Sequence, residues 1–489
     1  MPQMKATRRW TLLAILALLT GLILAACGDN TNTPAPAATT AAATTAASSA
    51  TTAAATTAAG GAATTAAATT AAGGAATTAA SGGTALTGNP NLKGDITVWA
   101  WNVAAKSLQA NVAGFNKLYP NVKVNVQDIG RLDVYDKLTT GLAAGGVGLP
   151  DVVAVESDHM DVYTSKFPDG FADLTSKASK YEKDFDPSKW AQSKIKGKIR
   201  SIPWDSGPVG VFYRVDMFQK AGVDPNSIET WDDFIAAGKK VQEANPGVKM
   251  AAIDYTKDDG LFRMIMGQQG AYYFNQDGKI TINSPEAVNA MTIIKKLKDA
   301  DLLTNIQGWD GTVAASVNSK VATQTFGVWW SGTLTDSAPD QKGKWGVMPI
   351  PALTKGGSRA TNLGGSTLAV PSSSKNQDAA WAFVEYSLCT TEGQNNIIKN
   401  FGIWPSYIPA YSDPFYTAPQ PYFNNQPIWK IFSAEIPQLK SVFYTSDNDK
   451  GLTIGADAQA AVLSGTDPAQ ALQKAADQLK QQTGRDLAK

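Results

Sequence analysis

Tryptophan and acidic side chains recur where the chain is expected to leave a strand. The chain contains 13 Trp, and several stand in turn-like places where burial in a core is not the obvious explanation. Trp101-Asn102 follow one predicted strand, and Glu156 and Asp158 follow another. Ligands of parallel α/β sheets bind outside the carboxyl ends of the strands. These four side chains are therefore predicted to face a binding site.

Further candidates follow glycines and prolines later in the chain. They are Trp204-Asp205 after Ile202-Pro203, Trp329-Trp330 between Gly327 and Gly332, Asn362 before Gly364-Gly365, and Trp404 before Pro405. Each has a structural alternative: the tryptophan pair packs a domain, Trp204 braces a chain crossing, and Glu156 and Asp158 form a solvated strand end. His159 is expected to be an exposed loop side chain, with donation to a ligand as the alternative.

Catalytic and metal chemistry find little support in the sequence. One His and two Cys in 489 residues make a zinc site improbable, so no metal, cofactor or catalytic residue is predicted. The chain has no Gly-x-Ser-x-Gly elbow and no Gly-Lys-Ser/Thr phosphate loop. Asp158 and Asp205 could form the carboxylate pair of a secreted glycosidase, which stays as an alternative. A net charge of +1 gives no field that would attract nucleic acid.

The N-terminus has the order of a secretory signal. Lys5, Arg8 and Arg9 precede an uncharged, Leu-rich run that ends at Leu24-Ala25-Ala26-Cys27. The Cys after Leu-Ala-Ala resembles the bacterial lipobox, so residues 1–26 are predicted to be removed and Cys27 to carry lipid on the outer face of the cytoplasmic membrane. An uncleaved anchor and an ordinary signal are the alternatives. Residues 30–92 carry no charge and are mostly Ala and Thr, which predicts a disordered tether over 27–93.

The remaining chain, residues 94–489, alternates predicted strands and helices. Strands are expected over 95–101, 122–126 and 152–155, and helices between them, which is typical of an α/β fold with a mainly parallel sheet. Thr230 with Asp233 predicts a capping box, and Ser284-Pro285 predicts a helix start. Cys389 lies in a helical pattern and is expected to be a buried thiol. The length is sufficient for two domains.

An ordered set of short motifs carries a family resemblance across residues 94–489. These motifs are Pro150-Asp151-Val152-Val153, Ile202-Pro203-Trp204, Val211 to Phe218, Gly222, Thr230 to Phe234, Gly327 to Ser331, Gly346 to Pro351, Gly364-Gly365 and Ala379 to Phe383. In this order and spacing the chain resembles the extracellular solute-binding proteins of ABC importers, in the carbohydrate-binding group that includes maltose-binding protein. It departs from that group at Val155, where the maltose receptor has an aromatic residue.

The resemblance implies a two-lobe, type II α/β fold with the ligand between lobes joined by several crossings. The implied lobes are 94–209 with 367–403, and 210–366 with 404–489. It places Asp158 at a sugar-binding acidic position and Trp329 or Trp330 at a stacking position. The expected function is that of a monomeric, lipid-anchored receptor that delivers a saccharide to a membrane permease. A non-sugar solute in the same fold is the first alternative.

Overall fold

The computed structural model describes residues 86–488, all within one compact unit. The predicted signal peptide, Cys27 and the tether as far as residue 85 lie outside the described residues. Among the described residues, no helix is long and apolar enough to cross a membrane.

The first sheet is the framework of what we call the first lobe. Its strand order is β2 (Val122–Asp128), β1 (Gly94–Ala100), β3 (Val152–Glu156), β12 (Ser366–Ala369) and β6 (Ile202–Pro203). β1 pairs in parallel with β2 and β3, whereas β12 is antiparallel to β3 and β6. The apolar run at residues 152–155 is fully buried in β3, as expected for a strand covered on both faces.

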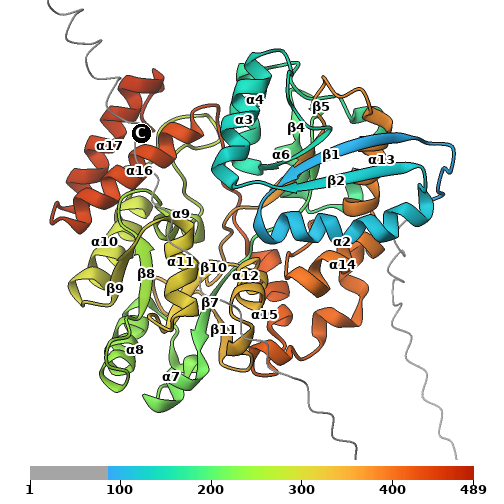
Figure 1. Ribbon diagram of the computed structural model, residues 1–489. Helices are drawn as coiled ribbons and strands as arrows, with labels where there is room; N and C mark the ends of the chain where they lie inside the picture. The colour runs from blue at the N-terminus through green and yellow to red at the C-terminus, as the bar shows by residue number, and fades with distance from the viewer. Residues whose placement is uncertain (1–85, 489) are drawn as a thin grey trace, which may run out of the picture. The chain divides into compact units, whose positions relative to one another are not determined.

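Helices cover this sheet, and α2 runs alongside β1 and β2 (Figure 1). They are α2 (Asn102–Leu118), α3 (Arg131–Ala143), α4 (Ser157–Lys166), α5 (Thr175–Ala178), α6 (Pro187–Ser193), α13 (Gln377–Leu388) and α14 (Thr391–Phe401), with the small hairpin β4 (Lys194–Ile195) and β5 (Lys198–Ile199). Leu108 and Phe115, seven residues apart on α2, are both fully buried, because that spacing puts them on one helix face. Cys389 is also buried, as predicted.

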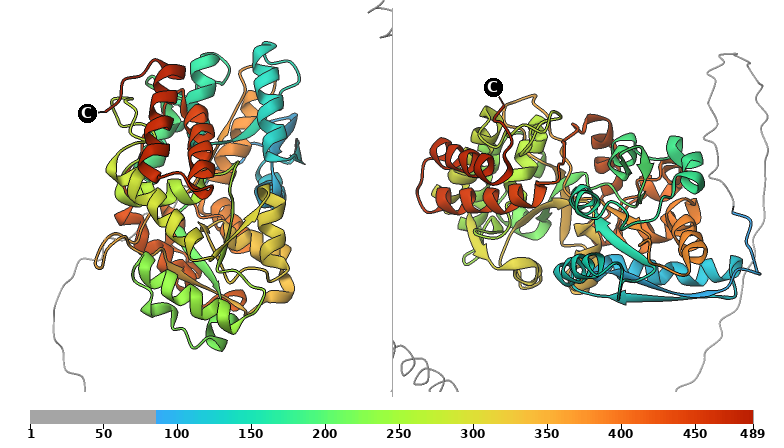
Figure 2. Two further views of the ribbon diagram at one scale, coloured as in Figure 1. Left: turned by 90° about the vertical axis from the view of Figure 1, so that its left-hand side faces the viewer. Right: turned by 90° about the horizontal axis from the view of Figure 1, so that it is seen from above.

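The second lobe is built around an antiparallel sheet in the order β10-β7-β11, with the parallel pair β8-β9 beside it. The strands are β7 (Val209–Arg214), β8 (Ala251–Asp254), β9 (Leu303–Ile306), β10 (Thr323–Gly327) and β11 (Trp345–Pro349). The helices are α7 (Val215–Lys220), α8 (Trp231–Ala244), α9 (Gly260–Gln269), α10 (Pro285–Asp299), α11 (Gly308–Val317), α12 (Trp330–Ser337), α15 (Ile428–Glu435), α16 (Asn448–Leu463) and α17 (Pro468–Thr483). The last two pack side by side (Figure 2).

Local signals in the sequence explain where several of these helices begin. The Thr230 side chain accepts from the Asp233 N–H while the Asp233 carboxylate accepts from the Thr230 N–H, so the predicted capping box of α8 is confirmed. The Ser284 side chain caps α10, whose first residue is Pro285. This start is also as predicted.

Three chain segments cross between the lobes side by side. Residues 204–208 lead from β6 to β7, and they are bridged to Pro405 through Asp205 and to Asn362 through Pro208. The Leu363 N–H donates to the Gly207 carbonyl at 2.8 Å. A Cβ on Gly207 would lie only 2.0 Å from the carbonyl oxygen of Leu363. Glycine is therefore required at 207 by the close approach of two crossing strands.

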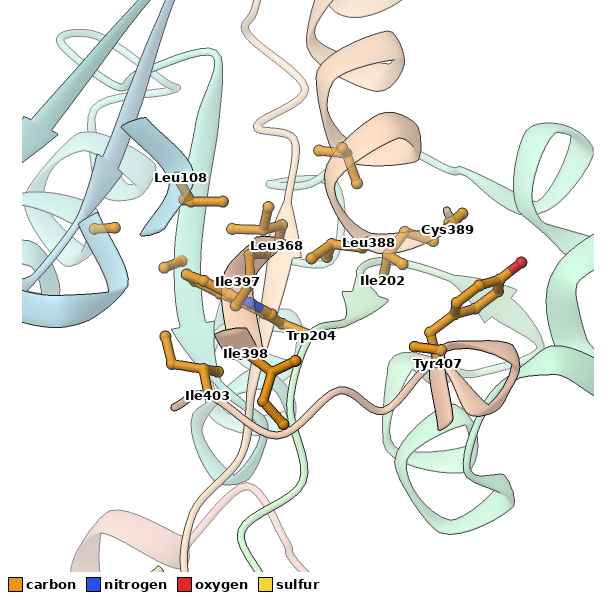
Figure 3. Close-up of a cluster of buried hydrophobic side chains, with 14 of the residues drawn as sticks. Leu108, Ile202, Trp204, Leu368, Leu388, Cys389, Ile397, Ile398, Ile403 and Tyr407 are labelled. Carbon is orange, nitrogen blue, oxygen red and sulfur yellow. The ribbon is translucent and has the colours of Figure 1, made fainter. Parts of the chain in front are cut away.

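Trp204 lies inside the core of the first lobe. Its indole is surrounded by buried side chains that come from β6, β12, α14 and the loop after α14, among them Ile202, Leu368, Ile397 and Ile403 (Figure 3). Only 1% of Trp204 is exposed. This ring fixes the start of the first crossing by packing.

Candidate functional site

A narrow cleft lies between the lobes where the crossings pass, with a cavity volume of only about 10 Å³ in this structure. Its lining joins one residue of α4, two of α9, part of the second crossing and two loops of the second lobe: Asp158, Arg263, Gly267, Tyr272, Asn362, Leu363, Gly364, Val442 and Tyr444. Among the sequence candidates, Asp158 and Asn362 are brought together here. The lining is polar and aromatic, with one carboxylate and one guanidinium.

Asp158 lies in the first turn of α4, directly after β3. Its neighbour Ser157 donates its backbone N–H to the Gly365 carbonyl at 2.9 Å, which ties the start of α4 to the second crossing. Only 9% of Asp158 is exposed. Within residues 86–488, its carboxylate forms no hydrogen bond or ion pair. A buried carboxylate can accept hydrogen bonds from a ligand, and the helix N-terminus favours its negative charge.

Arg263 stands in the cleft wall contributed by the second lobe. Its Nε donates to Asp259 at 2.8 Å and one terminal nitrogen donates to Asp258 at 3.1 Å. The Tyr273 hydroxyl also donates to Asp259. Burial raises the pKa of Asp259 to about 6, although the Arg263 charge opposes that rise. The guanidinium is thus held in one orientation by two carboxylates.

A charged chain continues from the cleft across the two lobes. Glu156 Oε2 accepts from Arg131 and from the Tyr135 hydroxyl, both at 2.6 Å. His159 Nδ1 lies 2.9 Å from Asp449 Oδ1 on α16, and its Nε2 lies 3.8 Å from Glu156 Oε2. The expectation of an exposed loop His is wrong: His159 is on α4, its side chain is 14% exposed, and it connects the lobes.

The carboxylates around His159 set its charge. Burial alone would lower the pKa of His159, but Asp158, Asp449 and Glu156 raise it to about 9. Burial alone would likewise raise the pKa of Glu156, but Arg131 and His159 hold it at about 2. At neutral pH both partners are therefore ionised.

The same three neighbours, Glu156, Asp158 and His159, have ligand atoms within 4.8 Å of one another, as a metal site would require. They do not fit a bound metal. His159 Nδ1 is already paired with Asp449 Oδ1, and Glu156 Oε2 already accepts from Arg131 and Tyr135.

The predicted tryptophans separate into buried and accessible rings. Trp204, Trp330 and Trp404 are at most 1% exposed. Trp329 is half-buried and donates its indole N–H to the Leu363 carbonyl at 3.2 Å, which places it next to the cleft lining. Trp329 lies in a turn with Val328, as predicted, whereas Trp330 is the first residue of α12.

The remaining candidates lie at the edges of the cleft or within the crossings. Asp205 is buried and accepts from the Ser366 N–H at 2.7 Å, and burial raises its pKa to about 7. The Asn362 amide connects two crossings. It accepts from the Gly207 N–H of the first crossing and donates to the Gly364 carbonyl of its own. Trp101 is half-buried with its ring 6.0 Å from Tyr135, and the exposed Asn102 starts α2.

Seven of the nine cleft residues were not site candidates from the sequence: Arg263, Gly267, Tyr272, Leu363, Gly364, Val442 and Tyr444. A signal existed for Arg263, because it interrupts the apolar run Leu261 to Met266 of α9 with one basic residue. Tyr272, Val442 and Tyr444 lie in irregular segments that no periodicity marks, so only the fold brings them to the cleft.

Comparison with known proteins supports both the fold and the family. The family model described as bacterial extracellular solute-binding protein matches residues 99–388. A lactose-binding protein of Rhizobium radiobacter is 31% identical over 376 residues, covering 74% of this chain and 87% of its own. An arabinooligosaccharide-binding protein of Bacillus subtilis (strain 168) is 28% identical over 320 residues, covering 64% and 73%.

Two solved structures have the same architecture. The GacH receptor of Streptomyces glaucescens GLA.O aligns with a TM-score of 0.70 at 24% identity, covering 81% of this chain and 100% of its own. A binding protein of B. animalis subsp. lactis Bl-04, in complex with β-1,6-galactobiose, aligns at 0.69 with 27% identity, covering 82% and 100%. The predicted two-lobe, type II α/β fold is therefore confirmed, and the chain belongs to the family of bacterial extracellular solute-binding proteins.

Proposed function

We propose that the protein is an extracellular receptor that captures a saccharide between its lobes and delivers it to an ABC importer. The carrying observation is the Asp158 carboxylate, which is buried in the cleft with no hydrogen bond or ion pair in the described chain and shares that lining with the fixed Arg263 guanidinium. Adjacent sugar hydroxyls satisfy such a pair, donating to the carboxylate and accepting from the guanidinium.

The relatives narrow the class of ligand. Proteins named for lactose and for arabinooligosaccharides are among the similar chains, and a structure at 27% identity holds β-1,6-galactobiose. All three ligands contain at least two sugar units. We therefore infer an oligosaccharide, with a disaccharide as the smallest ligand.

Capture follows from the placement of the two charged groups on different lobes. Asp158 is on α4 of the first lobe and Arg263 on α9 of the second. A ligand that bridges them binds the closed arrangement better than an open one, and so shifts the population toward closure. Bending would occur at the three crossings, and the closed lobes would present a joint surface to the permease.

The proposal also includes anchoring and the division into lobes. Cys27 would carry the lipid, the Ala/Thr-rich segment to residue 93 would tether the body, and the lobes would be 94–209 with 367–403 and 210–366 with 404–489. The motifs that support anchoring lie in residues 1–85, and the expected location is the outer face of the cytoplasmic membrane. The protein is proposed to work as a monomer.

The test is titration calorimetry and thermal shift with lactose, β-1,6-galactobiose, arabinooligosaccharides, their monosaccharides and a polyol. At a hundredfold excess over Kd, a bound sugar stabilises the fold by about 2.7 kcal/mol. Asp158→Asn is expected to weaken binding at least tenfold, because charge-assisted hydrogen bonds contribute about 1.5–3 kcal/mol. Asp161→Asn, on the same helix but outside the cleft lining, is the matched control.

Two outcomes would replace the proposal. A response to the polyol alone would assign a non-sugar solute. Release of reducing ends from an oligosaccharide during incubation would show a glycoside-acting enzyme instead.

A further inference from the structure

Trp309 is an exposed aromatic side chain that the proposed capture mechanism does not use. It is the second residue of α11, and 37% of it is exposed. The turn before it is fixed, since Gly308 has φ +61° and donates its N–H to the Asp254 carboxylate at 2.9 Å. The backbone therefore holds Trp309 at a defined place on the surface.

Beneath Trp309 lies a rigid aromatic layer. Its ring centroid is 5.4 Å from that of the buried Trp330 in an edge-on arrangement at 88°, and 6.0 Å from that of Trp329. Phe326 stacks on Trp330 at 4.7 Å. Such pairs favour offset or edge-on packing, and Trp has only two side-chain torsions to immobilise. The ring is thus pre-organised while it still faces solvent.

Trp309 and the aromatic layer beneath it adjoin the cleft through Trp329. That residue packs against Trp309 on one side and donates to the Leu363 carbonyl of the cleft lining on the other. The first lobe also comes close here, because Val103 lies against Gly332 and Lys106 forms an ion pair with Asp336 at 2.7 Å. The first turns of α2 therefore stand beside α12.

The surroundings of Trp309 carry hydrogen-bonding groups. Gln307 precedes it and Asp310 follows it, and both are exposed. An apolar ring face beside an amide and a carboxylate matches a sugar ring, which has a C–H face and equatorial hydroxyls. An extended apolar partner surface would instead need further exposed apolar side chains around the ring.

We propose that Trp309 is a specificity-determining residue that stacks against a further sugar unit, beyond the unit held by Asp158 and Arg263, and so favours longer saccharides. The inference rests on the proposed function, because it needs a saccharide in the cleft. It adds a second contact region and assigns the preference for chain length to one residue.

The experiment is calorimetry with β-galacto- and arabino-oligosaccharides of two to five units, on the wild type, Trp309→Ala and Trp309→Phe. For Trp309→Ala we expect a loss of about fivefold to tenfold in affinity for the longest ligand, and less than about twofold for the disaccharide. Trp309→Phe should restore most of the loss. Ile408→Ala, at a residue of similar exposure (41%), is the surface control and should change nothing.

The outcomes separate this inference from the function on which it depends. An equal loss for every chain length, or no loss for any, would overturn the role of Trp309, while strong weakening by Asp158→Asn would keep the saccharide receptor. Absence of any saccharide binding by the wild type would overturn both. Unchanged binding with reduced transport by the intact importer would reassign Trp309 to the permease contact.

Discussion

Two clusters adjoin the cleft lining, an aromatic end next to Leu363 and a charged end next to Asp158, and they are built from different side chains. At the aromatic end, Trp309 packs against Trp329 and Trp330, and the contacts are between rings. At the charged end, Arg131, Glu156, His159 and Asp449 form a chain of ion pairs that passes from one lobe to the other. One end offers apolar surface and the other offers charge.

The difference teaches how each end responds to change. Ring packing is insensitive to pH, and its cost on truncation depends on how deeply the ring is buried. The charged end depends on protonation and on the contact between α4 and α16. Truncations at the aromatic end should therefore lower stability according to how deeply the ring is buried, whereas the stability contributed by the charged end should change with pH.

The largest effect is expected for Trp330→Ala. The ring is fully buried, and removing a buried Trp costs about 3–5 kcal/mol of unfolding free energy. Urea denaturation measures this loss. A Trp330→Ala protein of native stability that failed to bind sugar would contradict the assignment of Trp330 to the buried layer, because Trp330 would then contact the ligand itself.

The charged end should reveal itself through pH. The folded-state pKa of His159 is about 9, above its usual value of about 6.5. The charged His159 therefore stabilises the folded state by about 3 kcal/mol below about pH 6.5, and this contribution is lost as pH rises through about 9. The measurement is the difference in unfolding free energy between wild type and His159→Gln from pH 6 to 10. A difference that stays constant over this range would exclude a charged His159.

Trp329 and Trp330 could be recognised together in the sequence for a physical reason. Phe326 to Trp330 form one continuous segment that begins at the end of strand β10, so the motif and its neighbours are visible together. Trp330 is buried where α12 begins. The glycines on either side led to the prediction that both tryptophans lie in a turn.

The charged end could not be assembled from local patterns. His159 and Asp449 are separated by 290 residues (449 − 159) and meet only because α4 packs against α16. The same holds for Trp204 and Trp404, which were expected at the cleft edge but are buried. Trp204 is enclosed by side chains from β6, β12 and α14, and Trp404 packs against aromatic rings that follow it in the chain. Periodicity identifies the elements, whereas burial at a crossing depends on the segments that lie beside it.

The smallest loss of stability is expected for Trp329→Ala, which can be compared directly with Trp330→Ala. Trp329 is half-buried and its indole makes one hydrogen bond, to the Leu363 carbonyl. We expect Trp329→Ala to lower the unfolding free energy by about 2 kcal/mol, about half the cost for a fully buried Trp, because the ring is half-buried, and to weaken saccharide binding about tenfold through lost stacking. Calorimetry and urea denaturation on the same preparation give both numbers. Because Trp330→Ala should show the reverse ratio, a stability loss for Trp329→Ala as large as that of Trp330→Ala would place both rings in the core and leave Trp309 without its link to the cleft.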